Sequence, residues 1–127
     1  MVDPKPGAVV HVELTSNDLS ATRKFLEGVF GWKFKKEEMP GMGDMEYWTF
    51  DAGSGPGGGL TNPMDGRPAD TLNYILVESA DAAVKKIVAH GGKIIMPKQE
   101  IPKIGWFAIY EIPGGVVQAI FQPARKP

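Results

Sequence analysis

The stretch HVELTSNDLSATRKFLEGVFGW, residues 11–32, recurs in outline as LNYILVESADAAVKKIVAHGGK at residues 72–93. When the two stretches are aligned, an alternating strand, a helix and a glycine stop coincide, with Leu14 over Ile75. Self-similarity at a fixed spacing is the sequence signature of a repeated structural unit. The chain is therefore predicted to contain two copies of one small unit built from strands and a helix.

The first copy has the pattern of a β-α-β-β-β unit. Apolar and polar residues alternate at the start, so Val12 and Leu14 face one side of a strand while His11 and Glu13 face the other. A cluster of capping residues before Leu19 marks the start of an amphipathic helix, and glycine ends it. The predicted elements are a strand at 9–14, a helix at 18–30, and strands that begin at 32, 46 and 59.

The second copy follows a polar segment, residues 61–70, which carries two prolines and is predicted to be the linker. Ser79 is the expected N-cap of its helix, which the pair Gly91-Gly92 ends. The remaining elements are predicted to be strands at 71–78, 93–96, 106–111 and 116–122, with a long loop at 97–105.

These patterns predict one α+β domain over the 127 residues. Module one spans about 7–60 and module two about 71–123. The two tandem βαβββ modules are expected to form a cupped, mostly antiparallel sheet with the helices on its outer face. Because such a sheet leaves edges and an apolar face, a homodimer is also expected.

Composition narrows the classes of partner. The 14 basic and 15 acidic side chains give a net charge of −1, and no basic stripe is visible, so neither nucleic acid nor a membrane is an expected partner. The absence of cysteine excludes disulfides and thiolate metal sites. The N-terminus lacks the pattern of a signal peptide, and the expected location is the cytoplasm.

Several motifs, taken in order, resemble a known family. They are HVEL near the start, FLEGVFGW at the end of the first helix, ADAAV followed by GG in the second, and EIPGGVVQAIFQP at the end. Together they resemble the vicinal oxygen chelate superfamily, also called the glyoxalase/bleomycin resistance protein/dioxygenase fold, and in particular a branch of small glyoxalase-like proteins of undefined function. The resemblance covers nearly the whole chain and implies the fold; the fold alone does not fix a reaction.

The resemblance also implies where a divalent metal would bind in metal-dependent members. Their ligands are His or Glu side chains, one near the start and one near the last strand of each module. At the matching positions this chain has His11, Leu72, Ala119 and a residue in or near the stretch 57–59, so only His11 keeps a ligand. Because ligand number sets metal affinity, no metal or other cofactor is expected, and a site with the non-standard ligands His11, Glu13 and Glu46 is the alternative.

His11 and Glu13 are the candidate catalytic residues. They share one face of the first strand, where they could act as an acid/base pair, and the carboxylate is expected to raise the pKa of the imidazole. The alternative is a polar pair that only lines a binding pocket. Tyr74 lies at the position of Glu13 in the second copy, where it could hydrogen-bond a ligand or simply be half exposed.

Two strands rich in aromatic residues could line a site for a flat or apolar small molecule. Alternation divides each strand between core and site, and the pattern does not say which set faces where. The candidate ligand-binding residues are Tyr47, Trp48, Leu72, Tyr74, Trp106 and Ala119.

Three functions stay open at this point. The first is a metal-independent enzyme of the lyase or isomerase type that uses His11 and Glu13. The second is a non-catalytic protein that binds, senses or sequesters an apolar or aromatic small molecule, as resistance members of this fold do. The third is a metal-dependent glyoxalase or dioxygenase with non-standard ligands.

Overall fold

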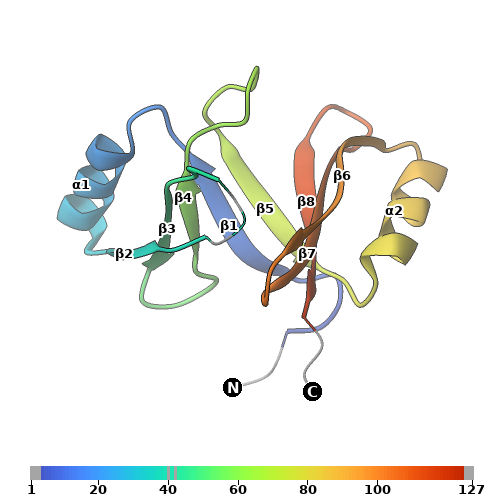
Figure 1. Cartoon of the computed structure of the whole chain (residues 1–127), viewed down its shortest axis with the longest axis horizontal. Helices are drawn as coiled ribbons and strands as arrows, with labels where there is room; N and C mark the ends of the chain where they lie inside the picture. The colour runs from blue at the N-terminus through green and yellow to red at the C-terminus, as the bar shows by residue number, and fades with distance from the viewer. Residues whose placement is uncertain (1–3, 40, 42, 125–127) are drawn as a thin grey trace. The chain divides into compact units, whose positions relative to one another are not determined.

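The computed structural model describes residues 4–39, 41 and 43–124 (Figure 1). It confirms the predicted α+β fold: each module has the order β-α-β-β-β, and the eight strands form one mixed, mostly antiparallel sheet. No helix in this part of the chain is long and apolar enough to cross a membrane. The elements are β1 (Val9–Thr15), α1 (Leu19–Phe30), β2 (Lys33–Glu37), β3 (Tyr47–Asp51), β4 (Gly58–Thr61), β5 (Thr71–Leu76), α2 (Ala80–Ala89), β6 (Lys93–Ile101), β7 (Gly105–Glu111) and β8 (Val117–Pro123).

The chain divides into two compact units, and each is described by itself. The first unit spans residues 11–72, and the second joins residues 73–124 to the segment that ends at Val10. In the second unit, the backbone N–H groups of Gly7 and Leu76 bond to Leu76 and Ala8, respectively, which ties that segment to β5. The start of the chain therefore groups with the second unit, although the sequence pattern assigns residues 7–10 to module one.

The first unit has the strand order β2-β3-β4-β1, in which β1 and β4 are parallel and the other pairs antiparallel. Helix α1 lies beside β2 (Figure 1). It begins because the Asp18 carboxylate accepts a hydrogen bond from the backbone N–H of Ala21, and it ends at Gly31, whose φ of 73° is in the left-handed region. The predicted linker starts inside β4, because this strand ends at Thr61. Thr61 is buried, and its hydroxyl donates a hydrogen bond to the Glu46 carbonyl.

The apolar stripe predicted for α1 is only partly buried. Leu19 is buried, whereas Phe25, Val29 and Phe30 are 61%, 56% and 63% exposed. Exposed apolar residues on one helix are compatible with association. The homodimer stays a prediction. It requires that light scattering give a mass twice the 13.8 kDa of the chain.

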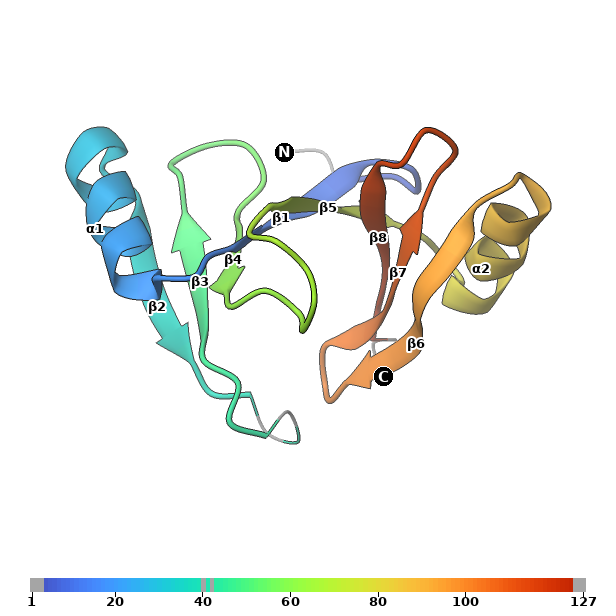
Figure 2. The same ribbon diagram turned by 90° about the horizontal axis from the view of Figure 1, so that it is seen from above.

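The second unit has the strand order β5-β8-β7-β6, in which β5 and β8 are parallel. Helix α2 packs against β6, β7 and β8 (Figure 2). Its first turn is capped twice: the Ser79 hydroxyl accepts from the N–H of Ala82, and the Gln122 amide oxygen accepts from the N–H of Ala80. The buried cluster at this helix consists of Ala80, the first residue of α2, and of Ala108, Tyr110 and Ile120 in the strands beneath it.

The long loop predicted at residues 97–105 is wrong. Strand β6 continues through Pro97 to Ile101, and its pairing with β7 shifts register at two places. Proline is tolerated because β6 has a paired neighbour on one side only, and the irregular register accommodates the missing N–H. Periodicity alone did not show a strand that contains bulges.

Strand register gives an exact correspondence between the two units. In the first unit Gly59 of β4 lies opposite Glu13 of β1, and in the second Ala119 of β8 lies opposite Tyr74 of β5. The neighbouring antiparallel strands agree, because Gly59 pairs with Thr49 and Ala119 pairs with Ile109. Positions two residues before Glu13, Tyr74, Thr49 and Ile109 are then equivalent as well. The four pairs of equivalent positions used below are His11 and Leu72, Glu13 and Tyr74, Tyr47 and Phe107, and Gly59 and Ala119.

Candidate functional site

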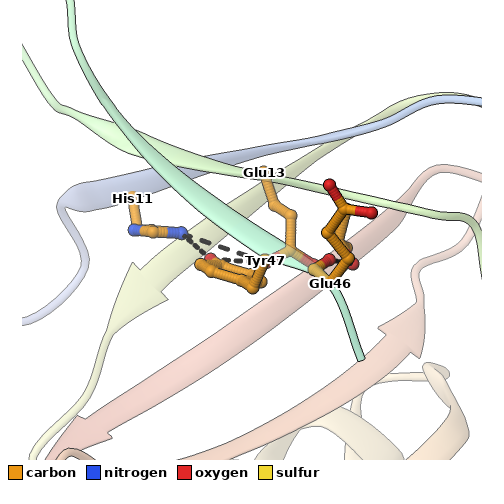
Figure 3. Close-up of polar contacts among 5 residues, drawn as sticks. His11, Glu13, Glu46 and Tyr47 are labelled. Atoms are coloured by element: carbon orange, nitrogen blue, oxygen red, sulfur yellow. Dashed lines mark hydrogen bonds and ion pairs between the residues drawn. The ribbon is translucent and has the colours of Figure 1, made fainter. Parts of the chain in front are cut away.

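Three side chains of the first unit meet in a hydrogen-bonded chain (Figure 3). The Tyr47 hydroxyl lies 2.9 Å from His11 Nε2 and 2.9 Å from Glu13 Oε1. His11 Nε2 and Glu13 Oε1 are themselves 4.0 Å apart. The two residues predicted to act together are therefore joined through a third residue, for which the sequence had suggested only a place among the ligand-binding aromatics.

Strand geometry explains how Tyr47 reaches the other two side chains. His11 and Glu13 are two residues apart in β1, so they point to the same face. Tyr47 is in β3, and β4 lies between β3 and β1. The β4 residue opposite Glu13 is Gly59, and a Cβ atom built there would overlap the Tyr47 hydroxyl. The phenol thus occupies the space above a residue without a side chain.

The network fixes where the protons lie. A tyrosine hydroxyl has one proton, and Tyr47 donates it to the Glu13 carboxylate. The contact between Tyr47 and His11 must then be a hydrogen bond donated by Nε2–H of the imidazole, because two acceptors at 2.9 Å would repel each other. Neutral His11 is accordingly the Nε2–H tautomer, whose basic nitrogen is Nδ1.

The expected direction of the His11 pKa shift is wrong. Burial lowers the pKa of His11 from its ordinary value of 6.5, because taking the imidazolium out of water disfavours the charged form. The Glu13 carboxylate does not reverse this shift, since the Tyr47 hydroxyl stands between the two groups and the carboxylate oxygen is 4.0 Å from Nε2. His11 is therefore mostly neutral at pH 7, as a general base must be.

We expect acidification to destabilise the protein through His11. Because its pKa is lower in the folded chain than in the unfolded chain, the unfolded chain takes up a proton first. The contribution of neutral His11 to the free energy of unfolding is fully present above pH 6.5. It is lost as the pH falls from 6.5 through the lower folded-state pKa. Urea unfolding at about pH 7.5 and 5.5 should show a larger loss for the wild type than for His11→Gln, and equal losses would contradict the assignment.

The described residues do not fit a divalent metal ion. Residues 4–39, 41 and 43–124 contain no group of three or more His, Asp or Glu side chains that could hold one. His11 and Glu13 supply two donors, and the Tyr47 hydroxyl already bonds to both. The other positions to which the resemblance assigns ligands are Leu72, Gly59 and Ala119, which have no donor atom in their side chains.

Glu46, the third residue of the alternative metal site, has a different role. Its carboxylate accepts a hydrogen bond of 2.8 Å from the indole N–H of Trp48. The structure does not bring it into a ligand group with His11 and Glu13.

Two predicted ligand-binding residues make contacts that do not involve the His11 network. Trp48 follows Tyr47 in β3 and points to the opposite face, where the Arg23 guanidinium of α1 stacks on its ring at 3.9 Å. Trp106 packs against the buried cluster beneath α2, and Lys98 Nζ lies 5.5 Å from the centre of its ring. Alternation divides the aromatic strands as expected, and the contacts now show which side each residue takes.

The other three predicted ligand-binding residues lie at or near β5. Leu72, the equivalent of His11, is partly buried in the first unit. Tyr74 is 7% exposed in the second unit, so it is not the half-exposed strand residue that was the alternative. Its ring centre lies 6.3 Å from that of Phe107, and the fully buried Ala119 lies opposite it in β8. A ligand-binding role for these residues stays a prediction.

Comparison with known proteins gives both a family and a set of relatives. The profile of the Glyoxalase/Bleomycin resistance protein/Dioxygenase superfamily matches residues 8–117. The chain is 30% identical over 119 residues to "Putative glyoxylase CFP32" of Mycobacterium bovis, with 90% of this chain and 45% of that protein covered. It is 29% identical over 136 residues to "Anthracycline biosynthesis protein DnrV" of Streptomyces peucetius, with coverages of 92% and 47%.

The chain thus spans about half the length of the curated relatives it matches. Among solved structures, methylmalonyl-CoA epimerase from Mycobacterium tuberculosis is similar, with a TM-score of 0.72 and 16% identity over 98% of this chain and 94% of that one. At this identity the likeness shows the fold alone. The profile match over most of the chain, on two βαβββ modules, places this protein in the glyoxalase/bleomycin resistance protein/dioxygenase superfamily.

Proposed function

We propose that the protein is an isomerase- or lyase-type enzyme that moves a proton on a small carbonyl compound without a metal ion. The observation that carries this proposal is the hydrogen-bonded chain His11–Tyr47–Glu13, with 2.9 Å at each step. An imidazole that donates a hydrogen bond to a group which is in turn held by a carboxylate resembles the arrangement that proton-transfer enzymes use to orient a histidine base.

The proposed roles follow from exposure and protonation. The His11 side chain is 31% exposed and that of Glu13 only 13%, so His11 is the group that meets the substrate. Nδ1 of neutral His11 takes a proton from carbon next to a carbonyl, and the electron pair of the broken C–H bond moves into an enolate. The Glu13 carboxylate, 4.0 Å away, stabilises the imidazolium that forms. Return of the proton to the same or a neighbouring carbon completes the reaction, with no oxidation or reduction.

The relatives indicate which compounds to try first. One similar fold belongs to an epimerase of a coenzyme A thioester, and one relative has a glyoxylase name. Thioesters with an α C–H bond and hemithioacetals of 2-oxoaldehydes both carry the acidic C–H group that this chemistry needs. These two classes are therefore the first probes.

Solvent deuterium exchange tests the proposal without a known product. Each probe is incubated with the protein in D₂O, and loss of the α-proton signal is followed by ¹H NMR. We expect exchange above the buffer rate for at least one probe class, and that exchange should survive treatment with a chelator. If every probe that binds in a thermal-shift assay exchanges only at the buffer rate, the proposal is wrong.

A second candidate is a protein that binds an apolar small molecule and does no chemistry. Strands β5 and β7 favour it, because their positions equivalent to His11, Glu13 and Tyr47 carry Leu72, Tyr74 and Phe107. The relative from anthracycline biosynthesis is compatible with an aromatic ligand. His11→Ala separates the candidates: binding that persists for a ligand that never exchanges favours the second, and loss of exchange with retained binding favours the first.

A further inference from the structure

We infer that Tyr47 is a positioning residue that selects the Nε2–H tautomer of His11, and that residue 59 is glycine in order to make room for it. This inference rests on the proposed function for its catalytic meaning. Its structural part is independent of any substrate: residue 59 has no side chain, and the Tyr47 hydroxyl from β3 takes that space. The contacts of Gly59 and the comparison of the two units support it.

Gly59 is required by space and not by backbone conformation. Glycines with positive φ elsewhere in the chain, such as Gly31 and Gly53, adopt a conformation that other residues avoid. Gly59 is not among them, so any residue could adopt its backbone conformation. A Cβ atom there would nevertheless overlap the hydroxyl oxygen and the adjoining ring carbon of Tyr47, and would lie 2.9 Å from another ring carbon.

The second unit shows the alternative solution at the equivalent positions. There the equivalent of Tyr47 is Phe107, which has a ring and no hydroxyl, and the equivalent of Gly59 is Ala119, which has a Cβ atom. Phenylalanine goes with alanine in one unit, and tyrosine goes with glycine in the other. The hydroxyl and the missing Cβ atom thus occur together, in the unit that also carries His11 and Glu13.

The close approach of Tyr47 to Gly59 also explains why the site does not fit a metal ion. The resemblance assigns a ligand to the stretch 57–59, and the register identifies that position as Gly59. A ligand side chain at 59 and the present Tyr47 hydroxyl cannot occupy the same space. The unit therefore has a proton-bearing group where a metal-dependent relative would have a ligand atom.

Histidine ¹⁵N NMR tests the tautomer directly. The chain has two histidines, so ring-labelled protein gives two sets of signals, and His11→Gln assigns them. At about pH 7.5, without substrate, wild-type His11 should show a protonated Nε2 and an unprotonated Nδ1. Tyr47→Phe should shift the tautomer ratio by about tenfold, the ratio that one hydrogen bond of typical strength supports. Tyr110→Phe, which removes another phenol hydroxyl bonded to Gln118, should leave it unchanged.

A wild-type spectrum with the proton on Nδ1 would overturn the inference, whether or not the variants fold. So would a Tyr47→Phe spectrum identical to that of the wild type. Both results are read without substrate, so they are independent of the deuterium-exchange assay. The tautomer can be confirmed while the proposed reaction fails, and the reverse also holds.

A double-mutant cycle tests whether residue 59 is glycine because Tyr47 occupies the space above it. Gly59→Ala should lower the urea midpoint in the wild type and lower it less in a Tyr47→Ala background, because the overlapping ring is gone. Gly58→Ala is the matched control: its Cβ atom would meet the Val12 carbonyl and the Phe50 ring, so its effect should be the same in both backgrounds. Additive effects of Gly59→Ala and Tyr47→Ala on the urea midpoint would contradict this explanation of Gly59.

Discussion

Replacing His11 with glutamine should reduce enzyme-dependent deuterium exchange by about 10²–10⁴-fold, the usual contribution of a general base. Glutamine is similar in size and keeps a hydrogen-bond donor that can reach the Tyr47 hydroxyl, but it cannot accept a proton at neutral pH. The measurement is the initial exchange rate of the best probe by ¹H NMR, at saturating probe concentration. Binding of the probe, followed by thermal shift, should change little.

His90→Gln is the matched control for this substitution. His90 is the C-cap of α2 in the other unit, where its Nδ1 lies 2.8 Å from the Lys86 carbonyl oxygen. Its loss should leave the exchange rate within about twofold of the wild type. A His11→Gln protein that is folded, binds the probe and exchanges at the wild-type rate would remove His11 from the mechanism.

Truncating Leu60 to alanine should have the largest effect on stability. Leu60 is fully buried in β4, next to Gly59, and its removal leaves a cavity in addition to the lost burial of its side chain. Leucine-to-alanine substitutions at buried positions cost about 2–5 kcal/mol. Chemical unfolding in urea should show this loss as a lower midpoint with an unchanged slope.

Phe25→Ala serves as the control for that substitution. Phe25 is a larger side chain but is 61% exposed on α1, so its truncation in a monomer should change the free energy of unfolding by about 0.5 kcal/mol or less. If both variants unfold at the same urea concentration, the burial of β4 in the structure is wrong. A large effect of Phe25→Ala alone would instead indicate that α1 is covered in solution.

The fold could be predicted because the chain carries its pattern twice. The strands, helices and glycine stops of the two copies agree, so each copy supports the assignment of the other. The errors lie where a local pattern does not report tertiary contacts. Strand β6 contains a proline and shifts of register that look like a loop in the sequence, and Val29 of the amphipathic helix α1 is 56% exposed.

The site could be predicted only in part. Alternation placed His11 and Glu13 on one face, because that depends on neighbours in a single strand. The role of Tyr47 depends on three strands in register, which the sequence does not specify. The predicted direction of the His11 pKa shift was wrong because the burial of the imidazole, which lowers the pKa, comes from tertiary contacts. One signal was available: a glycine at 59 in a buried strand often marks the close approach of another group.

In the proposed reaction, His11, Tyr47 and Glu13 act as one unit in proton transfer. The most direct test is a double-mutant cycle on the deuterium-exchange rate with His11→Gln, Glu13→Gln and both together. Residues that act through one another are non-additive, so we expect Glu13→Gln to reduce the rate strongly in the wild type and to have almost no further effect when His11 is already glutamine. Two independent, multiplying losses would contradict the account.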